Sequence, residues 1–224
     1  MLFRSLSVAT AEIAMLLILM SARRAGEGER LVRAGNWKGW APMLLLGTQI
    51  SAKRLGILGM GRIGRELAKM ARGFGMTIHY RNRTRLAPNL EHDAIWHNND
   101  ETFLANCDAL AMTAPGGAGT AKWLNADRLA LLPRGAIIAN AARGSLVDDV
   151  ALIAALRSGQ VAFAGLDVYD GEPNLNPGYF GLENVVLLPH MGSSTTQTRA
   201  AMGNLCLDAI TTILSGGTPP NLIP

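Results

Sequence analysis

From Lys53 onward, short apolar runs alternate with longer segments in which apolar residues recur at intervals of three and four. The short runs predict buried strands, because turn-forming residues bound them and they are too short for stable helices. The recurring segments predict helices that bury one face. We expect strands at residues 55–58, 77–80, 109–113, 136–139, 163–166 and 185–188, and helices at residues 63–74, 99–106, 126–132, 148–158 and 195–214.

The expected strands are apolar along their whole length, and the expected helices lie between them in the sequence. Strands that are buried on both faces and joined by helices form a parallel sheet with helices on both sides. The sequence therefore predicts the α/β class with a doubly wound, Rossmann-type sheet. Because ligands of such sheets bind at the carboxyl ends of the strands, the residues that follow each strand are candidates for a site.

The first part of the chain has a different pattern. Residues 10–34 are interpreted as one long helix, apolar on all sides at first and charged later, and residues 35–42 form a Gly/Trp/Pro loop. The apolar run at residues 13–20 is too short to cross a bilayer, which needs about 20 residues. Its charges are also misplaced for a signal peptide, because Glu12 precedes the run and Arg23 follows it. We therefore expect a buried helix and a cytoplasmic protein.

Composition narrows the choice of function. Of the 224 residues 49% are hydrophobic, which is enough for a real core, and the net charge of +4 is modest. Basic residues do not form runs interleaved with aromatic ones, so no nucleic-acid partner is expected. Cys107 and Cys206 both lie in apolar surroundings, which favours two reduced, buried thiols. No His/Cys/Asp cluster has the spacing of metal ligands, so no metal site is expected.

Three glycines follow the first strand of the alternating region. Gly59, Gly61 and Gly64 form the pattern G-x-G-x-x-G at the junction of a strand and a helix, which is the context that dinucleotide binding requires. Gly59 permits the tight turn, Gly61 lets the backbone approach a pyrophosphate, and Gly64 allows close helix–strand packing. The helix N-terminus attracts phosphate. A turn that merely needs glycine is the weaker alternative.

The end of the second expected strand bears on the choice of cofactor. NAD-binding folds usually place an acidic residue there to accept hydrogen bonds from the ribose hydroxyls. Here Asn82 takes that position, and Arg81, Arg83 and Arg85 surround it. Asn does not repel a 2′-phosphate, and arginine pairs with phosphate in bidentate fashion. We expect NADP (NADPH) to be preferred over NAD; an ordinary solvated basic loop is the alternative.

Three further polar residues follow expected strands. Arg143, Glu172 and His190 come to the same sheet edge as the glycine loop. An arginine that binds a carboxylate, a histidine that supplies a proton and a carboxylate that orients the histidine are what reduction of a 2-keto acid requires. Asp170 is a competing carboxylate. His79 lies inside a strand and is interpreted as structural, whereas His92 and His97 show no partner pattern.

Several motifs occur together and in order: the glycine loop and the segments 74–76, 114–117, 140–148, 167–173 and 189–193. From about residue 8 onward the chain resembles the D-isomer-specific 2-hydroxyacid dehydrogenases. The segments 115–117, 82–83 and 37–40 look closest to the glyoxylate/hydroxypyruvate reductases of that family. The resemblance implies that Arg143, Glu172 and His190 are catalytic and that Asp167 holds the nicotinamide carboxamide. It also implies cofactor contacts at Gly59, Gly61, Arg62, Ile63, Gly64, Asn82, Arg83, Thr84, Ala114, Pro115, Thr120, Ala141, Ala142, Arg143, Asp167, His190 and Gly192.

The resemblance also predicts the organisation of the chain. Residues 1–52 would be an N-terminal helix and Trp/Pro loop that serves as a dimerisation arm, and residues 53–192 a dinucleotide-binding domain. Residues 193–224 would be a C-terminal helix left over from a substrate domain that is absent here. We expect a homodimer, because the apolar first helix has no internal cover. We expect cofactor binding with weak or no reduction of a small 2-keto acid such as glyoxylate or hydroxypyruvate. The alternative is a non-catalytic dinucleotide-binding or interaction module.

Overall fold

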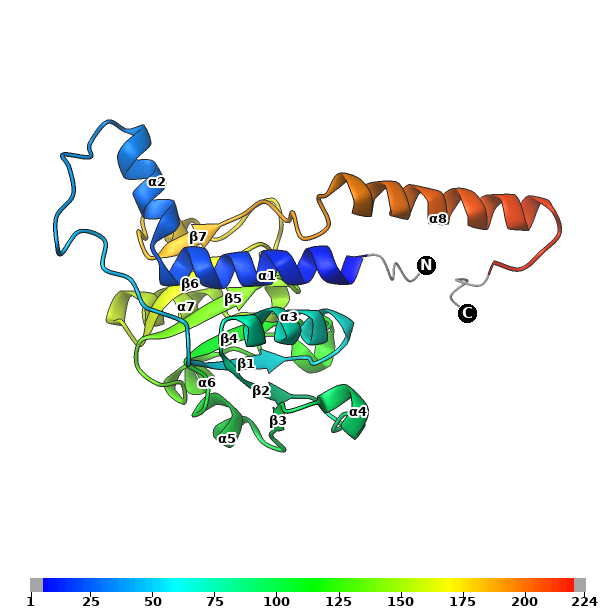
Figure 1. Ribbon diagram of the computed structural model, residues 1–224, viewed down its shortest axis with the longest axis horizontal. Coiled ribbons are helices and arrows are strands. Elements are labelled where there is room, and N and C mark those ends of the chain that lie inside the picture. The colour runs from blue at the N-terminus through cyan, green and yellow to red at the C-terminus, as the bar shows by residue number, and fades with distance from the viewer. Residues whose placement is uncertain (1–5, 220–224) are drawn as a thin grey trace.

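A seven-stranded parallel sheet forms the centre of the computed structural model, which describes residues 6–219 (Figure 1). The strand order is β3-β2-β1-β4-β5-β6-β7, so the order reverses between β1 and β4. This confirms the doubly wound α/β fold. The strands are β1 (Arg54–Leu58), β2 (Thr77–Arg81), β3 (Ile95–Trp96), β4 (Ala109–Met112), β5 (Ala136–Asn140), β6 (Val161–Leu166) and β7 (Val185–Leu187).

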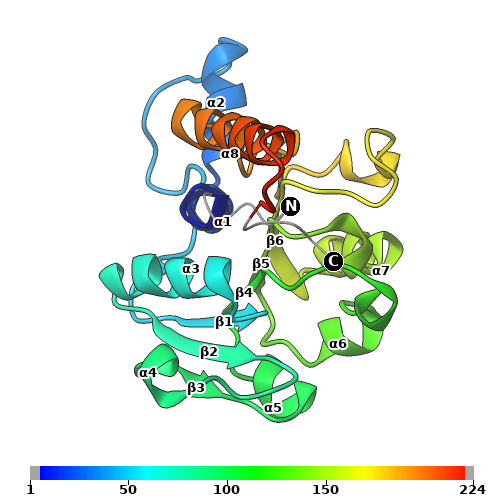
Figure 2. The ribbon, with the colours of Figure 1, turned by 90° about the vertical axis from the view of Figure 1, so that its right-hand side faces the viewer.

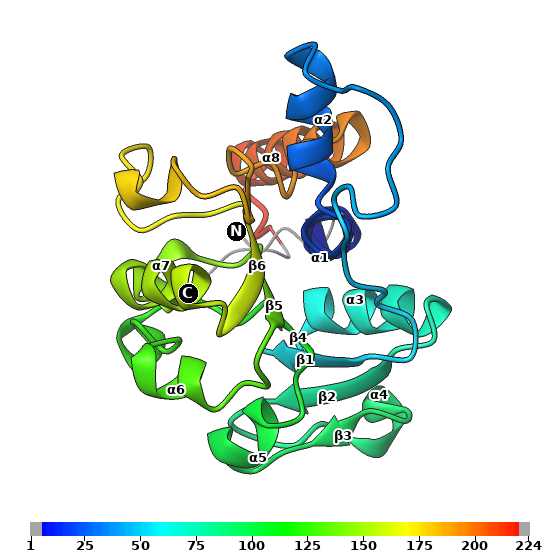
Figure 3. The same ribbon diagram turned by 90° about the vertical axis from the view of Figure 1, so that its left-hand side faces the viewer.

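Helices cover both faces of this sheet (Figures 2 and 3). One face carries α1 (Ser7–Ala22) and α3 (Arg62–Gly73), and the other carries α5 (Asp100–Leu104), α6 (Ala126–Ala130) and α7 (Asp149–Ser158). The start of α7 follows from its sequence, since the Asp148 carboxylate accepts the N–H groups of Val150 and Ala151. Its end follows too, because Gly159 adopts φ 71°.

The expected segments of the alternating region correspond to elements of the structure within a few residues. The sequence missed α4 (Pro88–Glu91) and β3 (Ile95–Trp96). Both are too short to show a period, and β3 has one exposed and one half-buried residue rather than an apolar run.

The reading of residues 10–34 as one helix is wrong. The chain forms α1 and a second helix, α2 (Ala25–Arg33), and it turns sharply between them at Arg24, which has φ 52°. The Arg24 guanidinium is held there by the carboxylate of Glu27, with N–O distances of 2.9 and 2.8 Å. No residue of α2 is buried. The helix therefore breaks where the buried, apolar part of the sequence ends (Figure 1).

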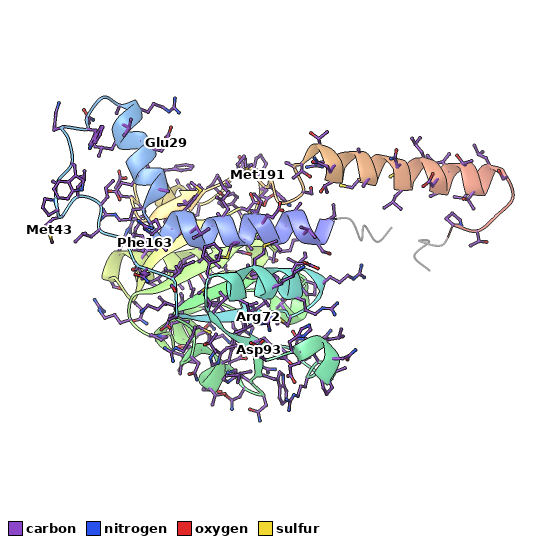
Figure 4. The ribbon with its side chains drawn as sticks, in the orientation of Figure 1. Glu29, Met43, Arg72, Asp93, Phe163 and Met191 are labelled. Carbon is purple, nitrogen blue, oxygen red and sulfur yellow. The ribbon has the colours of Figure 1, made fainter. Side chains whose placement is uncertain are left out.

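The expectation that the apolar first helix needs a partner for cover is also wrong. Helix α1 packs on α3 and on strands β5 and β6, and Leu17 and Ile18 are fully buried. A group of exposed apolar side chains lies instead in the segment between α2 and β1. We call these side chains the loop patch; they are Trp37, Trp40, Met43, Leu44 and Leu46. Figure 4 shows Met43 at the outer edge of the molecule.

The last helix, α8 (Thr196–Leu214), projects away from the sheet (Figure 1). Its apolar side chains are covered only in part, since Ala209 is buried whereas Ile213 is exposed. Cys206 is only partly buried for the same reason, so the expectation of two buried thiols holds for Cys107 alone. No helix within residues 6–219 has the length and apolar character that crossing a membrane requires. The division of the chain at residues 53 and 193 stays a prediction, and residues 1–5 and 220–224 of its outer segments lie outside the described residues.

Candidate functional site

The glycine loop joins β1 to α3 at the carboxyl edge of the sheet. Gly59 has φ 95°, and a Cβ there would lie 2.5 Å from the backbone of Ala114, so only glycine fits. A Cβ on Gly64 would lie 2.7 Å from the Gly59 carbonyl, which confirms the close helix–strand contact. Gly61, in contrast, has no neighbouring atom closer than 4.0 Å to the position of its missing Cβ. The space next to Gly61, at the N-terminus of α3, is therefore open.

That open space suits the phosphates of a dinucleotide. The first N–H groups of a helix, here those of Arg62 and Ile63, have no partner within the helix and point along its axis toward bound anions. Neighbouring segments fix the loop: the Thr113 hydroxyl donates to the Gly59 carbonyl (2.8 Å). The Thr120 hydroxyl donates to the Pro115 carbonyl (3.0 Å) and so shapes the loop after β4. The residues present therefore fit a dinucleotide cofactor.

The end of β2 is tied directly to the glycine loop. The Met60 N–H donates to Asn82 Oδ1 at 2.7 Å, a contact that the sequence did not reveal. Of the three arginines around Asn82, Arg81 is paired with Asp100 at 3.0 Å and Arg85 with Glu91 at 2.8 Å. Within the described part of the chain, Arg83 forms no ion pair or side-chain hydrogen bond, and it is exposed. One arginine rather than three is thus available to a ligand.

Arg143 follows β5 at the same sheet edge. It is exposed, and its Nη1 atom donates to the carbonyl of Ala142 at 2.6 Å. A Cβ on Gly116 would lie 2.9 Å from Arg143 Cγ, so the glycine of the preceding loop leaves room for the arginine stem. The neighbouring Gly144 allows the turn to pack against backbone atoms of Tyr169.

Glu172 and His190 meet although 18 residues separate them. His190 Nδ1 lies 2.7 Å from Glu172 Oε2, and the Tyr169 N–H donates to the other carboxylate oxygen at 2.9 Å. Burial on its own raises the pKa of Glu172, but the contacts with His190, the Tyr169 N–H and the nearby positive charge of Arg143 outweigh it, so this pKa is lowered. Glu172 is therefore a carboxylate that orients the histidine. The competing Asp170 has no such contact with His190.

Asp167 lies beneath this pair, with 1% of its surface exposed. Its two carboxylate oxygens accept the N–H groups of Met191 and Gly192, each at 2.8 Å. Burial raises the pKa of Asp167, and these two hydrogen bonds oppose the rise. The carboxylate thus fixes the loop in which His190 adopts φ 52° (Met191 is labelled in Figure 4). Its predicted contact with the nicotinamide carboxamide stays a prediction.

His97 does have a partner, contrary to the sequence reading. Its Nε2 atom lies 2.9 Å from Nδ1 of the buried His79, because β3 pairs with β2 and brings the two residues side by side. Burial lowers the pKa of both imidazoles, and we keep the structural interpretation for this pair. Among the described residues no group of three His, Cys, Asp or Glu side chains is placed to hold a metal ion.

Comparison with known proteins agrees with this arrangement. Residues 15–192 match the family described as D-isomer specific 2-hydroxyacid dehydrogenase, NAD binding domain. A glycerate dehydrogenase from Hyphomicrobium methylovorum is 45% identical over 212 residues, covering 94% of this chain and 66% of that protein. The chain therefore spans about two thirds of the length of such relatives.

Solved structures give the same result. The crystal structure described as a putative D-isomer specific 2-hydroxyacid dehydrogenase from Polaromonas sp. superposes with a TM-score of 0.96 at 49% identity, covering 98% of this chain and 69% of the other. An NADPH-dependent glyoxylate/hydroxypyruvate reductase from Sinorhizobium meliloti, in complex with NADP and malonate, has a TM-score of 0.87 at 34% identity. That match covers 94% of this chain and 65% of the reductase.

Proposed function

This chain belongs to the D-isomer specific 2-hydroxyacid dehydrogenase family, and on that premise we propose that it carries the cofactor site and the acid–base group of an NADPH-dependent reductase of small 2-keto acids. The observation that carries the proposal is the 2.7 Å contact between His190 and Glu172. It lies at the sheet edge that also bears the glycine loop and Arg143.

In the proposed reaction a 2-keto acid, such as glyoxylate or hydroxypyruvate, becomes a 2-hydroxy acid. NADPH, when bound, supplies the hydride that adds to the carbonyl carbon. Glu172 accepts the Nδ1–H of His190, which leaves Nε2 as the atom that delivers a proton to the carbonyl oxygen. The guanidinium of Arg143 binds the substrate carboxylate and polarises the carbonyl. One hydride and one proton are transferred, so the reaction balances without a metal ion.

The cofactor preference rests on the end of β2. Asn82 offers no negative charge to repel a 2′-phosphate. The exposed side chain of Arg83, which no ion pair holds within residues 6–219, is available to bind one. An aspartate at position 82 would still accept the Met60 N–H, so Asn82→Asp changes the charge without removing that contact. We expect wild type to bind NADPH more tightly than NADH, and Asn82→Asp to reverse that order. Arg83→Ala should weaken binding of NADPH alone. Tighter binding of NADH by wild type would overturn the preference.

Catalysis is tested by following NADPH oxidation with glyoxylate and hydroxypyruvate. Turnover by wild type that is lost in His190→Ala, with cofactor affinity retained, supports the proposed reaction. Cofactor binding with no turnover that depends on His190 would select the other function considered, a non-catalytic dinucleotide-binding module. His92→Ala is a matched control for turnover, because His92 is an exposed histidine that follows α4, and no hydrogen bond or ion pair joins it to Glu172 or Arg143 within the described residues.

We further propose a homodimer in the cytoplasm. The loop patch places two tryptophans and three aliphatic side chains on the surface, and Trp40 is 82% exposed. Large apolar side chains exposed together in one segment are a feature of contact surfaces. Light scattering at micromolar concentration should give the mass of a dimer, and Trp40→Glu should lower it. A monomeric mass for wild type would contradict the proposal.

A further inference from the structure

Asn140 is the last residue of β5, and its side chain is completely buried at 0% exposure. Both functional groups of its amide are used on the turn that follows. The Oδ1 atom accepts the Ala142 N–H at 3.0 Å, and the Nδ2 atom donates to the Arg143 carbonyl at 2.9 Å. The amide therefore holds the backbone before and after the Cα atom of Arg143.

The turn held in this way also fixes the arginine side chain. Nη1 of Arg143 donates to the Ala142 carbonyl, and the N–H of that same residue is the group held by Asn140. If the amide is removed, the buried Ala142 N–H and the Arg143 carbonyl lose their partner, which favours rearrangement of the turn. Rearrangement would move the guanidinium.

Asn140 also contacts the neighbouring strand end. Its backbone carbonyl accepts the N–H of Asp167 at 2.9 Å, and the Asp167 carboxylate in turn accepts the N–H groups of residues 191 and 192. On the other side of the turn, a Cβ on Gly144 would lie 1.7 Å from the backbone carbon of Tyr169, so the turn is in direct contact with the segment that leads to Glu172. The Asn140 carbonyl and the Asp167 carboxylate thus join the ends of β5, β6 and β7.

From this geometry we propose that Asn140 is a positioning residue, which sets the place of the Arg143 guanidinium relative to Glu172 and His190. The inference rests on the proposed role of Arg143 as the group that binds the substrate carboxylate. It concerns substrate binding and leaves the glycine loop, on β1 and α3, unchanged. Loss of the Asn140 amide should therefore weaken binding of a keto acid more than binding of the cofactor, for which Ala141 and Ala142 are only two of the expected contacts.

Asn140→Asp is the sharpest variant, because it keeps the shape and removes the donor. When ionised, the new carboxylate faces the Arg143 carbonyl with no proton to give, whereas the protonated carboxyl can donate as the amide did. Burial favours the protonated form, so the donor returns as the pH falls. In Asn140→Ser the side chain is too short to reach both partners, so this variant should not hold the turn at any pH. Asn184→Asp is the matched control, since that amide donates to the carbonyls of Leu156 and Ala162 just before β7, at the opposite end of the strands.

Two measurements separate this inference from the proposed function. The first is hydrogen–deuterium exchange of residues 141–146 in the free chain, which needs no activity. The second is the affinity for oxamate, a carboxylate-bearing analogue of a 2-keto acid, at saturating NADPH, together with the NADPH dissociation constant. Each is compared with wild type at about pH 5.5 and about pH 8, on either side of the range expected for a buried carboxyl.

At about pH 8, Asn140→Asp should exchange faster at residues 141–146 and bind oxamate at least about tenfold more weakly. Its NADPH affinity should fall by a smaller factor, because the glycine loop is unchanged. Both properties should recover at about pH 5.5, and Asn184→Asp should leave both unchanged. Hydrogen exchange at the wild-type rate in both Asn140→Asp and Asn140→Ser would overturn the inference. So would an equal loss of oxamate affinity in Asn184→Asp. A wild type that binds no oxamate would instead refute the proposed substrate role of Arg143, and the exchange data would still decide whether Asn140 holds the turn.

Discussion

Replacing Leu17 by alanine tests whether α1 belongs to the core of the sheet or to a surface kept for another subunit. Leu17 is fully buried against β6, and a Cβ built on Gly165 would lie only 2.8 Å from the Cβ of Leu17. Because the facing residue has no side chain, β6 offers no group that can move into the space that the leucine leaves. The cavity should therefore persist.

The expected loss of stability follows from that geometry. Removing three carbon groups at about 0.8 kcal/mol each gives about 2.4 kcal/mol, and a cavity that does not collapse adds about 1–2 kcal/mol. We expect Leu17→Ala to lower the free energy of unfolding by about 4 kcal/mol. The neighbouring Leu16 is 39% exposed, so Leu16→Ala should lower it by less than about 1 kcal/mol.

Urea denaturation followed by circular dichroism measures both variants, and repeating it over a tenfold range of protein concentration separates core from interface. A core position gives a difference between the variant and wild type that does not depend on concentration. An equal decrease in the free energy of unfolding for Leu17→Ala and Leu16→Ala would refute the argument. So would a loss that disappears when the protein is diluted, because it would place Leu17 between subunits.

Three other predictions concern single side chains. Asp167→Asn replaces one of two charge-assisted acceptors by a donor that faces the Gly192 N–H, so it should lower the free energy of unfolding by about 1–3 kcal/mol and speed hydrogen exchange at residues 190–193; unchanged exchange there would contradict the role given to the carboxylate. The hydrogen bond from Arg54 lowers the pKa of Asp108 in the fold, so its contribution to stability is present above the unfolded-state pKa of about 3.9 and is lost as the pH falls through the lower folded-state pKa. Asp108→Asn should therefore flatten the acid limb of the stability curve, and an unchanged limb would show that the pair contributes nothing. Burial raises the pKa of the Cys107 thiol, so a thiol reagent at neutral pH should modify it only on unfolding, and rapid reaction in the native chain would disprove its burial.

Local sequence was sufficient wherever a short stretch of chain contains all the groups that decide its conformation. The three glycines at positions 59, 61 and 64 could be assigned from spacing, since a strand, a tight turn and a helix start are all local events. The same holds for the end of α7 at Gly159. Buried strands were found because an apolar run needs cover on both faces whatever provides it.

Sequence reasoning was insufficient where a residue depends on a partner far along the chain. The charges of Arg81 and Arg85 looked available for a phosphate, but Asp100 and Glu91 already pair with them. His97 looked isolated until β3 brought it beside β2. No local pattern contains this information, because pairing of strands and docking of helices decide it.

The first helix shows the same division. Its sequence determined that residues 13–20 form a helix with apolar side chains on every face, which must be covered. The tertiary structure decided what covers it: α3 and strands β5 and β6 of the same chain rather than a partner, with the bend at Arg24 placed where that cover ends. Likewise, the sequence supplied Arg143, Glu172 and His190 in order. Only the fold decided that Glu172 and His190 meet, with the charge of Arg143 nearby. Hydrogen bonds between neighbouring strand ends, and not spacing along the chain, fix these positions.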